Sequence, residues 1–277
     1  NTGSTADSNY DALSSQAVTT TTTDNDVART VTLSRSPTSV TEGNSGNQSV
    51  TITATISTTS SAATTVGLLT SAAPADAASS SGTMNFDKDY ALGSGSITIS
   101  AGALTGTATI TIYGDNVDED TEKVYVDLSS VSGGEGAVED GTQTANITIN
   151  DDDTAGFTIA ETSGTSVSEA GSTDTFTVVL NSKPTGNVVF NVTSGDTGEA
   201  TVSSSTLTFT TGNWNSAQTV TVTGVDDSDV DGTITSGITV AINTGSTADS
   251  LYDALSSQAV TTTTTDNDVA RTVTLTR

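Results

Sequence analysis

Carboxylate side chains are the groups in this sequence best placed to do chemistry. They gather in short clusters at the expected turns and unit junctions, whereas the segments between them are nearly free of charge. The clusters are Asp24/Asp26, Asp115–Glu122, Asp151–Asp153, Asp226–Asp231 and Asp266/Asp268, with the more isolated Glu42, Asp89 and Glu169 beside them in the sequence pattern.

The chemistry that such clusters indicate is the binding of a hard cation. Closely packed carboxylates repel one another unless a cation lies among them or some of them take up protons. Calcium takes about 6–8 oxygen ligands, and Asp, Glu and Asn supply them, whereas magnesium keeps more of its own waters. Zinc would lack its preferred histidine and cysteine ligands, because the sequence contains neither residue.

The clusters do not follow the spacing of an EF-hand loop. The ligands of a calcium ion would therefore have to converge from several loops at one end of a domain. The alternative interpretation is that these acids are solvated turn residues that cap nearby backbone groups. Their recurrence in the same order along the chain favours calcium.

Composition excludes several classes of partner. The 277 residues include 33 acidic and 7 basic side chains, which gives a net charge of -26. Binding to a nucleic-acid backbone needs clustered Lys and Arg, so no nucleic-acid partner is expected. An anionic membrane surface is disfavoured for the same reason, and no apolar run is long enough to insert in a bilayer. Without cysteine, no disulfide stabilises the fold.

The elements that must position the acids are β-strands. Apolar and polar residues alternate with a period of two, and the polar positions are mostly Thr, which suits the outward face of a strand. This predicts an all-β fold of antiparallel sandwiches, with one short turn at residues 10–13 and its copy at 252–255. The expected strands include residues 49–56, 108–112, 124–128, 145–149, 175–180, 206–209, 219–222, and the threonine tracts 19–23 and 261–265.

An internal repeat defines the domain organisation. Residues 1–35 return as residues 243–277 with two differences, Asn9/Leu251 and Ser34/Thr276, at an offset of 242 residues. A fainter repeat lies within this period, because an Asp-rich triplet is followed 18 residues later by a Glu at both Glu42 and Glu169. We therefore expect residues 1–28 to be the last strands of a preceding repeat, 29–153 and 154–268 to be two sandwiches, and 269–277 to be the first strand of a following repeat.

The ordered motifs of the first unit resemble those of the Calx-beta domain. The motifs are Val40-Thr41-Glu42-Gly43-Asn44, Asp87-Lys88-Asp89-Tyr90, Gly114-Asp115-Asn116, Glu119-Asp120-Thr121-Glu122-Lys123-Val124 and Asp151-Asp152-Asp153. The resemblance implies a tandem array of Ig-like Calx-beta sandwiches, common in giant bacterial surface proteins, with calcium bound at one end of each sandwich. It implies as ligands Glu42, Asp89, Asp115, Glu119, Glu122, Asp151, Asp152 and Asp153.

The second unit resembles a divergent member of the same family. It contains Glu169-Ala170-Gly171, Asn213-Trp214-Asn215 and Val225-Asp226-Asp227-Ser228, but it lacks the Asp-Tyr element and the Glu-x-x-Glu pair. Asp227, Asp229 and Asp231 could take the place of those missing acids. With the junction clusters included, the remaining predicted calcium ligands are Asp24, Asp26, Glu169, Asp226, Asp227, Asp229, Asp266 and Asp268.

Three functions follow as hypotheses. The first is a secreted, cell-surface stalk or filament stiffened by calcium, whose partners are neighbouring repeats or copies of itself. The second is an adhesin module that binds a glycan or a surface protein, which the fold alone does not decide. The third is a carboxylate-based hydrolase. No nucleophile elbow or phosphate loop is present, and the acid pairs lie where calcium would bind, so we expect no enzyme.

Overall fold

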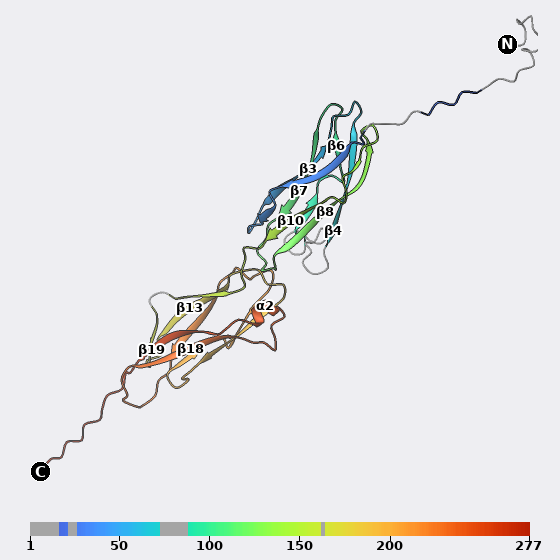
Figure 1. Ribbon diagram of the computed structural model, residues 1–277. Coiled ribbons are helices and arrows are strands. Elements are labelled where there is room, and N and C mark those ends of the chain that lie inside the picture. The colour runs from blue at the N-terminus through green and yellow to red at the C-terminus, as the bar shows by residue number, and fades with distance from the viewer. Residues whose placement is uncertain (1–16, 22–26, 73–87, 162–163) are drawn as a thin grey trace, which may run out of the picture.

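The computed structural model describes residues 17–21, 27–72, 88–161 and 164–277. Two β-sandwiches follow one another along the chain and lie end to end, and the C-terminal tail leaves from the end of the second sandwich that points away from the first (Figure 1). The expected all-β tandem architecture is confirmed. Among the described residues, no helix is long and apolar enough to span a bilayer.

The first sandwich packs one five-stranded sheet, in the order β5-β7-β3-β1-β9, against another, in the order β2-β10-β8-β4-β6. Most neighbours are antiparallel, but β2 runs parallel to β10 and β1 runs parallel to β9. Its strands are β1 (Thr30–Ser36), β2 (Ser39–Thr41), β3 (Asn47–Ile56), β4 (Thr64–Ala72), β5 (Tyr90–Leu92), β6 (Ser96–Ile99), β7 (Thr105–Tyr113), β8 (Glu122–Gly133), β9 (Val138–Glu139) and β10 (Thr144–Asn150).

The second sandwich repeats this plan with a four-stranded sheet, β11-β13-β17-β15, and a five-stranded sheet, β12-β19-β18-β14-β16. Here β12 pairs in parallel with β19, as β2 does with β10. Its elements are β11 (Phe157–Glu161), β12 (Thr165–Ser168), β13 (Thr173–Leu180), β14 (Val188–Ser194), β15 (Ala200–Val202), β16 (Thr206–Phe209), β17 (Gln218–Gly224), β18 (Ile234–Ile242), the short helix α2 (Ser250–Asp253) and β19 (Gln258–Thr265).

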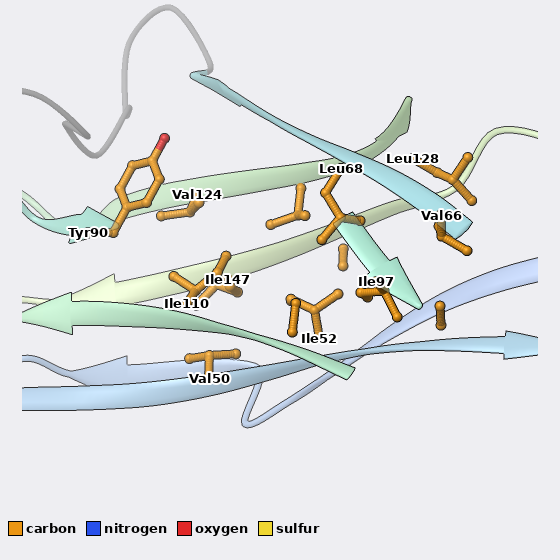
Figure 2. Packing of buried hydrophobic residues seen from close by; sticks show 14 of the residues in the cluster. Val50, Ile52, Val66, Leu68, Tyr90, Ile97, Ile110, Val124, Leu128 and Ile147 are labelled. Atoms are coloured by element: carbon orange, nitrogen blue, oxygen red, sulfur yellow. The ribbon is translucent and has the colours of Figure 1, made fainter. Parts of the chain in front are cut away.

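The first core is built from aliphatic side chains that alternate along each strand. On β3, Val50 and Ile52 are buried, whereas Thr51 between them is exposed. Ile110 on β7 and Ile147 on β10 face the same interior from the two sheets (Figure 2). Each such side chain contributes about 1.5–3 kcal/mol on burial, so the alternation itself holds the two sheets together.

The second core is centred on phenylalanines. The ring of Phe190 lies 4.7 Å from that of Phe157 and 5.9 Å from that of Phe209, and both pairs meet edge to face. Tyr252 of α2 is buried against the same cluster. Its hydroxyl donates to the carbonyl oxygen of Ser182 at 2.6 Å, so the helix is tied to the sandwich by a satisfied buried polar group.

The predicted strands within the two sandwiches are confirmed, and residues 261–265 lie in β19. The prediction for residues 19–23 is wrong at 19–21, which form no strand, while 22 and 23 lie outside the described residues. The physical reason is that the strands which flank this sequence in its second copy, β12 and β18, already hold β19. The turn predicted at residues 10–13 also lies outside the described residues.

Candidate metal centres

The first acid cluster forms at the end of the first sandwich where its last strand, β10, ends. The parallel pairing of β2 with β10 sets Val40 opposite Ile149, and the amide of Glu42 then donates to the carbonyl oxygen of Asn150 at 3.1 Å. Glu42 therefore emerges beside the closing turn that begins at Asp151. The loop from β7 to β8 carries Asp115, and Asp89 precedes β5 at the same end of the sheet.

Two glycines allow the acidic loops to approach the strands that carry the lone glutamates. A Cβ atom at Gly114 would overlap the carbonyl oxygens of Gly43 and Glu42, and a Cβ at Gly224 would overlap the carbonyl oxygen of Ser168. These positions are equivalent in the two sandwiches, because each lies at the end of the strand that pairs with β3 or β13. The absence of a side chain there brings each acidic loop against its glutamate.

The carboxylates of the first cluster converge at one point. Oxygen atoms of Asp89, Glu119 and Glu122 all lie within 4.8 Å of one another. Glu42, Asp89 and Asp115 are buried. Carboxylates that lie this close together, in buried or half-buried positions, are costly unless they are protonated or share a cation.

The electrostatics of the first cluster reflect that cost. Burial, reinforced by the charges of Asp115 and Glu119, raises the pKa of Glu42 to about 9. Burial followed by the charge of Asp89 and a hydrogen bond with it raises the pKa of Glu122 to about 8. Burial and the charge of Asp151 raise the pKa of Asp153 to about 6. A divalent cation among these groups would replace the protons that they otherwise retain.

The closing turn Asp151–Asp153 is held by hydrogen bonds that leave oxygen atoms available. Asp151 accepts from the amide of Glu119 at 3.0 Å, and Asp152 accepts from the amide of Gly43 at 2.9 Å. One oxygen of Asp153 accepts from the side chain of Asn44 at 2.7 Å. Its other oxygen is buried and has no hydrogen-bond partner among the described residues. An orphaned carboxylate oxygen in an acid cluster fits a calcium ligand.

The second sandwich has an acid cluster at its far end, from which the C-terminal tail leaves. Oxygens of Glu169, Asp227 and Asp268 lie within 4.8 Å of one another, and so do those of Glu169, Asp231 and Asp266. Glu169 is buried, and one of its oxygens accepts from the amide of Asn267 at 3.1 Å. The other oxygen of Glu169 is buried without a hydrogen-bond partner among the described residues.

The pKa shifts of the second cluster are mixed in direction. The hydrogen bond from Asn267 lowers the pKa of Glu169, but burial and the charge of Asp266 outweigh it, so that the pKa is raised. Burial and the charge of Asp266 also raise the pKa of Asp268. Backbone amides of Gly232 and Asp268 instead lower the pKa of Asp266. This cluster thus keeps some of its charge through local hydrogen bonds.

Sequence reasoning missed Glu199. This residue is buried, one of its oxygens has no hydrogen-bond partner among the described residues, and burial followed by the charge of Asp231 raises its pKa. It precedes β15, as Asp89 precedes β5, and its carbonyl oxygen accepts from the amide of Val225. The signal that could have found it is its place in the fold. Glu199 stands directly before β15, where the first sandwich has Asp89 of its Asp-Tyr element directly before β5.

The predicted ligands fall into three groups. The structure brings together all eight of the first sandwich and, in the second, Glu169, Asp227, Asp266 and Asp268. Asp226 and Asp229 lie at the border of the second cluster, where Asp226 accepts from the side chain of Asn267 and Asp229 donates its amide to Asp227. Asp24 and Asp26 lie outside the described residues. That any of these residues binds metal stays a prediction.

The loop of the first cluster is also the contact between the two sandwiches. The carbonyl oxygen of Asn116 accepts from the amide of Lys183 at 2.6 Å, and Asp118 accepts from the amide of Ala155 at the same distance. A cavity of about 350 Å³ lies beside these contacts and is lined from both sandwiches, with Asp115 on one side and Trp214 on the other.

Comparison with known proteins finds a family model and several solved structures that are similar to this chain. Residues 24–153 and 151–268 each match the family model of the Calx-beta domain. Similar solved structures include CBD12 from CALX1.2, at 19% identity over 76% of this chain and 79% of that chain, with a TM-score of 0.34. Others are the calcium binding domain CBD12 of CALX1.1, at 21% identity over the same shares with a TM-score of 0.37, and the apo-form Calx CBD1 domain, at 24% identity over 45% and 99% with a TM-score of 0.33. No curated protein sequence matches the chain.

Proposed function

Because this chain belongs to the Calx-beta domain family, with two tandem matches over residues 24–268, we propose that it is part of a calcium-stiffened extracellular stalk or filament. Its role is to bind ions and hold domains in line rather than to catalyse a reaction. Residues 1–28 would be the closing strands of a preceding domain of the second type. Residues 269–277 would be the first strand of a following domain of the first type.

The observation that carries this proposal is the double use of the loop Asp115–Glu122. Its carboxylates Asp115, Glu119 and Glu122 belong to the first acid cluster, while Asn116 and Asp118 hold the second sandwich by hydrogen bonds. An ion bound by the cluster would order the loop and, through it, the junction. Calcium binding would therefore reduce bending between the two domains.

The first cluster offers a ligand set that suits calcium. It supplies hard oxygen donors from several loops, some of them buried and one with an orphaned oxygen. The second cluster, completed by Glu199 and Asp231, would hold an ion at the far end of the second domain. An ion there would act on the junction with the following repeat in the same manner as the first ion acts on its own junction.

A second candidate function is adhesion, because a cavity lies at the junction. Trp214 and the amide side chains of Asn44 and Asn215 line it together with Lys183. A partly exposed aromatic side chain with neighbouring amides is a chemistry that suits a glycan. Trp214, however, also packs against the second core, and this favours a structural role for that side chain.

The test is to measure the chain with and without calcium. We expect millimolar calcium to raise the melting temperature of the first domain, because an ion present at 100 times its dissociation constant adds about 2.7 kcal/mol to the free energy of unfolding. Small-angle scattering in calcium should give a longer and more uniform particle than in EDTA. Glu119→Gln should reduce both effects, whereas the exposed neighbour Asp120, changed to Asn, serves as the matched control.

If calcium changes neither the melting temperature nor the particle length, the clusters are solvated turns and the stiffening mechanism is wrong. If calcium stabilises the first domain but leaves the particle length unchanged, ion binding stands and the coupling through Asn116 and Asp118 is wrong.

A further inference from the structure

The side chains beneath the two acid clusters differ in polarity. We call the inward-facing residues near the end of β10 and of β19 the floor of each cluster, because both strands lead directly into an Asp of that cluster. In the first sandwich the floor is Ile147 and Ile149, and both are buried. In the second sandwich Thr262 and Thr264 occupy the matching positions and are also buried, since β19 pairs with β12 as β10 pairs with β2. An aliphatic floor is thus replaced by one that carries hydroxyl groups.

The strand next to each floor shows the same replacement. Val124 on β8 lies opposite Ile147 and is buried, whereas Ser236 on β18 lies opposite Thr262. The hydroxyl oxygens of Ser236 and Thr262 are both buried, and neither has a hydrogen-bond partner among the described residues. Residues directly opposite each other in an antiparallel pair have Cβ atoms about 4.5–5.5 Å apart, so the two hydroxyls share one small region of the interior.

This polar floor adjoins the second acid cluster. The hydroxyl of Thr264 donates to the carbonyl oxygen of Glu199 at 3.4 Å, and Thr262 is the next inward-facing residue on the same strand. Glu169 and Glu199 are 1% and 6% exposed, and Thr262 is fully buried. Each of these two glutamates has one buried carboxylate oxygen without a hydrogen-bond partner in the described part of the chain. Unpartnered carboxylate and hydroxyl oxygens therefore occur together at this end of the sandwich.

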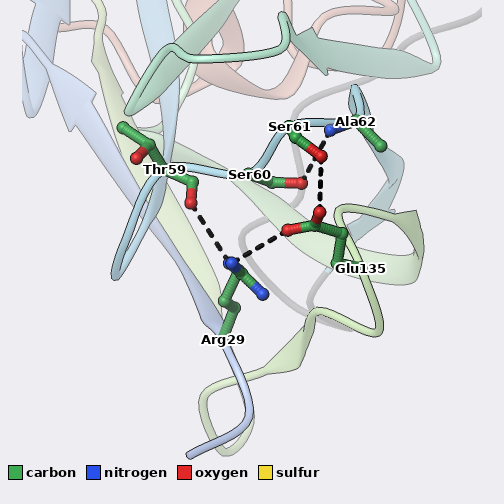
Figure 3. A network of polar contacts seen from close by, with 6 residues as sticks. All are labelled: Arg29, Thr59, Ser60, Ser61, Ala62 and Glu135. Atoms are coloured by element: carbon green, nitrogen blue, oxygen red, sulfur yellow. Dashed lines mark hydrogen bonds and ion pairs between the residues drawn. The ribbon is translucent and has the colours of Figure 1, made fainter. Parts of the chain in front are cut away.

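Polar side chains just before β1 show the more usual arrangement. There the guanidinium group of Arg29 forms an ion pair with Glu135 at 2.8 Å and donates to the carbonyl oxygen of Thr59 at 3.2 Å (Figure 3). The hydroxyl of Ser61 donates to the same Glu135 at 2.5 Å. Buried polar atoms normally find such partners, in the protein or in ordered water. Several unpartnered oxygens in one place therefore indicate a ligand that contacts them.

The ligand that suits both kinds of oxygen is a hydrated cation. Magnesium keeps several of its waters and is bound through one or two carboxylates, whereas calcium takes about 6–8 oxygen ligands in a flexible geometry. A buried water makes about three hydrogen bonds, and the hydroxyls of Thr262 and Ser236 offer such bonds to a water that the ion retains. The aliphatic floor of Ile147 and Ile149 offers none, so an ion that must keep its waters is disfavoured there.

We propose that the second acid cluster binds magnesium as well as calcium, with retained waters held by Thr262 and Ser236, whereas the first cluster binds calcium alone. This inference rests on the proposed binding of ions by the acid clusters and adds a difference in ion selectivity between the two domains. The second domain would then hold an ion even where calcium is scarce. Only the junction that follows the first domain would respond to the calcium concentration.

The test uses the full chain in EGTA, which removes calcium, with and without millimolar magnesium. Trp214 is the only tryptophan of the sequence and packs against the second core, so its fluorescence follows the unfolding of the second domain. We expect magnesium to raise the midpoint of this transition. Calorimetry should show that the first-domain transition is unchanged by magnesium and raised by calcium.

The variant Thr262→Val removes the floor hydroxyl with little change in volume. Loss of one hydrogen bond to a retained water should raise the apparent dissociation constant for magnesium by about tenfold, while most of the calcium-dependent shift remains. Thr262→Ser keeps the hydroxyl and should keep the magnesium effect. Thr261→Val makes the same change at an exposed neighbour on β19 and is the matched control, with no expected effect on either ion.

Three outcomes would overturn the proposal. The first is a second-domain midpoint that does not respond to magnesium, and the second is an equal magnesium shift in both domains. The third is a Thr262→Val variant whose midpoint falls equally with and without magnesium, because the hydroxyl would then serve folding alone. In each case a calcium-dependent shift of the first domain would leave the proposed calcium binding intact, whereas its absence alone would count against that function.

Discussion

The carboxylate of Asp118 accepts a hydrogen bond from the backbone amide of Ala155 at 2.6 Å, across the junction of the two sandwiches. Asp118 lies one residue before Glu119, a member of the first acid cluster. The junction is therefore held by the same loop that supplies carboxylates to the first acid cluster. If this loop is well ordered, the two domains are therefore held in a fixed alignment.

Changing Asp118 to Ala should loosen the junction without unfolding either domain. The variant loses one hydrogen bond, with a cost of about 0.5–1.5 kcal/mol, and retains Glu119 and Glu122. We expect small-angle scattering in calcium to show a broader distribution of interatomic distances than for the unmodified chain. Asp120→Ala removes the same charge from an exposed neighbour and should leave the distribution unchanged. An equal effect of both variants would point to charge rather than to the Ala155 contact.

The stability of the ion-free first domain should fall as pH rises from about 5 to 9. Glu42 has a pKa of about 9 in the fold against an ordinary value of 4.5, and Glu122 has a pKa of about 8. Between the unfolded and folded values the folded domain holds more protons, so its stability declines with pH, by up to about 1.4 kcal/mol per pH unit for each group. Urea unfolding in EDTA at several pH values measures the slope, and a rising stability over this range would contradict the burial of these acids.

Glu42→Gln should change stability in opposite directions with and without calcium. In EDTA at pH 8 the variant has no buried acid to keep protonated at this position, so we expect the first domain to melt at a higher temperature. In millimolar calcium it lacks one carboxylate of the cluster, so the calcium-dependent gain should shrink. Calorimetry under both conditions gives the two signs, and a loss of stability in EDTA would show that Glu42 has a packing role instead.

Tyr252→Phe should destabilise the second domain alone. The hydroxyl of Tyr252 donates to the carbonyl oxygen of Ser182 and accepts from the amide of the same residue at 3.2 Å, both in a buried position. Leaving those groups unsatisfied costs about 1–3 kcal/mol. Tyr10→Phe makes the same change in the other copy of the repeated sequence and should leave the second-domain transition unaltered. A matching loss in both variants would mean that Tyr10 also contributes to that transition.

The alternation of apolar and polar residues was enough to predict the strands of both sandwiches, because burial on one face imposes a period of two. The convergence of Glu42, Asp89, Asp115 and Glu122 could be expected only from the order of the motifs, since these residues are far apart in the sequence. Glu199 could not be found in that manner. Its segment has only Asp196 as a second acid and forms no cluster in the sequence, and the pairing of β15 with β17 brings Glu199 to the second cluster.

The threonine tract at residues 19–21 shows a second limit to predicting strands from the local sequence. Its sequence is identical to that of β19, yet it forms no strand. A strand needs neighbours, and β12 and β18 are already paired with the second copy. Local sequence therefore states what a segment can become, while the availability of partners decides whether it does.

The parallel pairing of the second and last strands in each sandwich has a mechanical consequence. β2 lies alongside β10, and β12 lies alongside β19, with both strands of each pair running in the same direction. Tension on the two ends of the chain pulls the members of a pair past each other along their length. The hydrogen bonds between them then share the load and must rupture together rather than one after another. The β2/β10 and β12/β19 pairs would therefore resist stretching, and the domains would unfold one at a time when the chain is pulled.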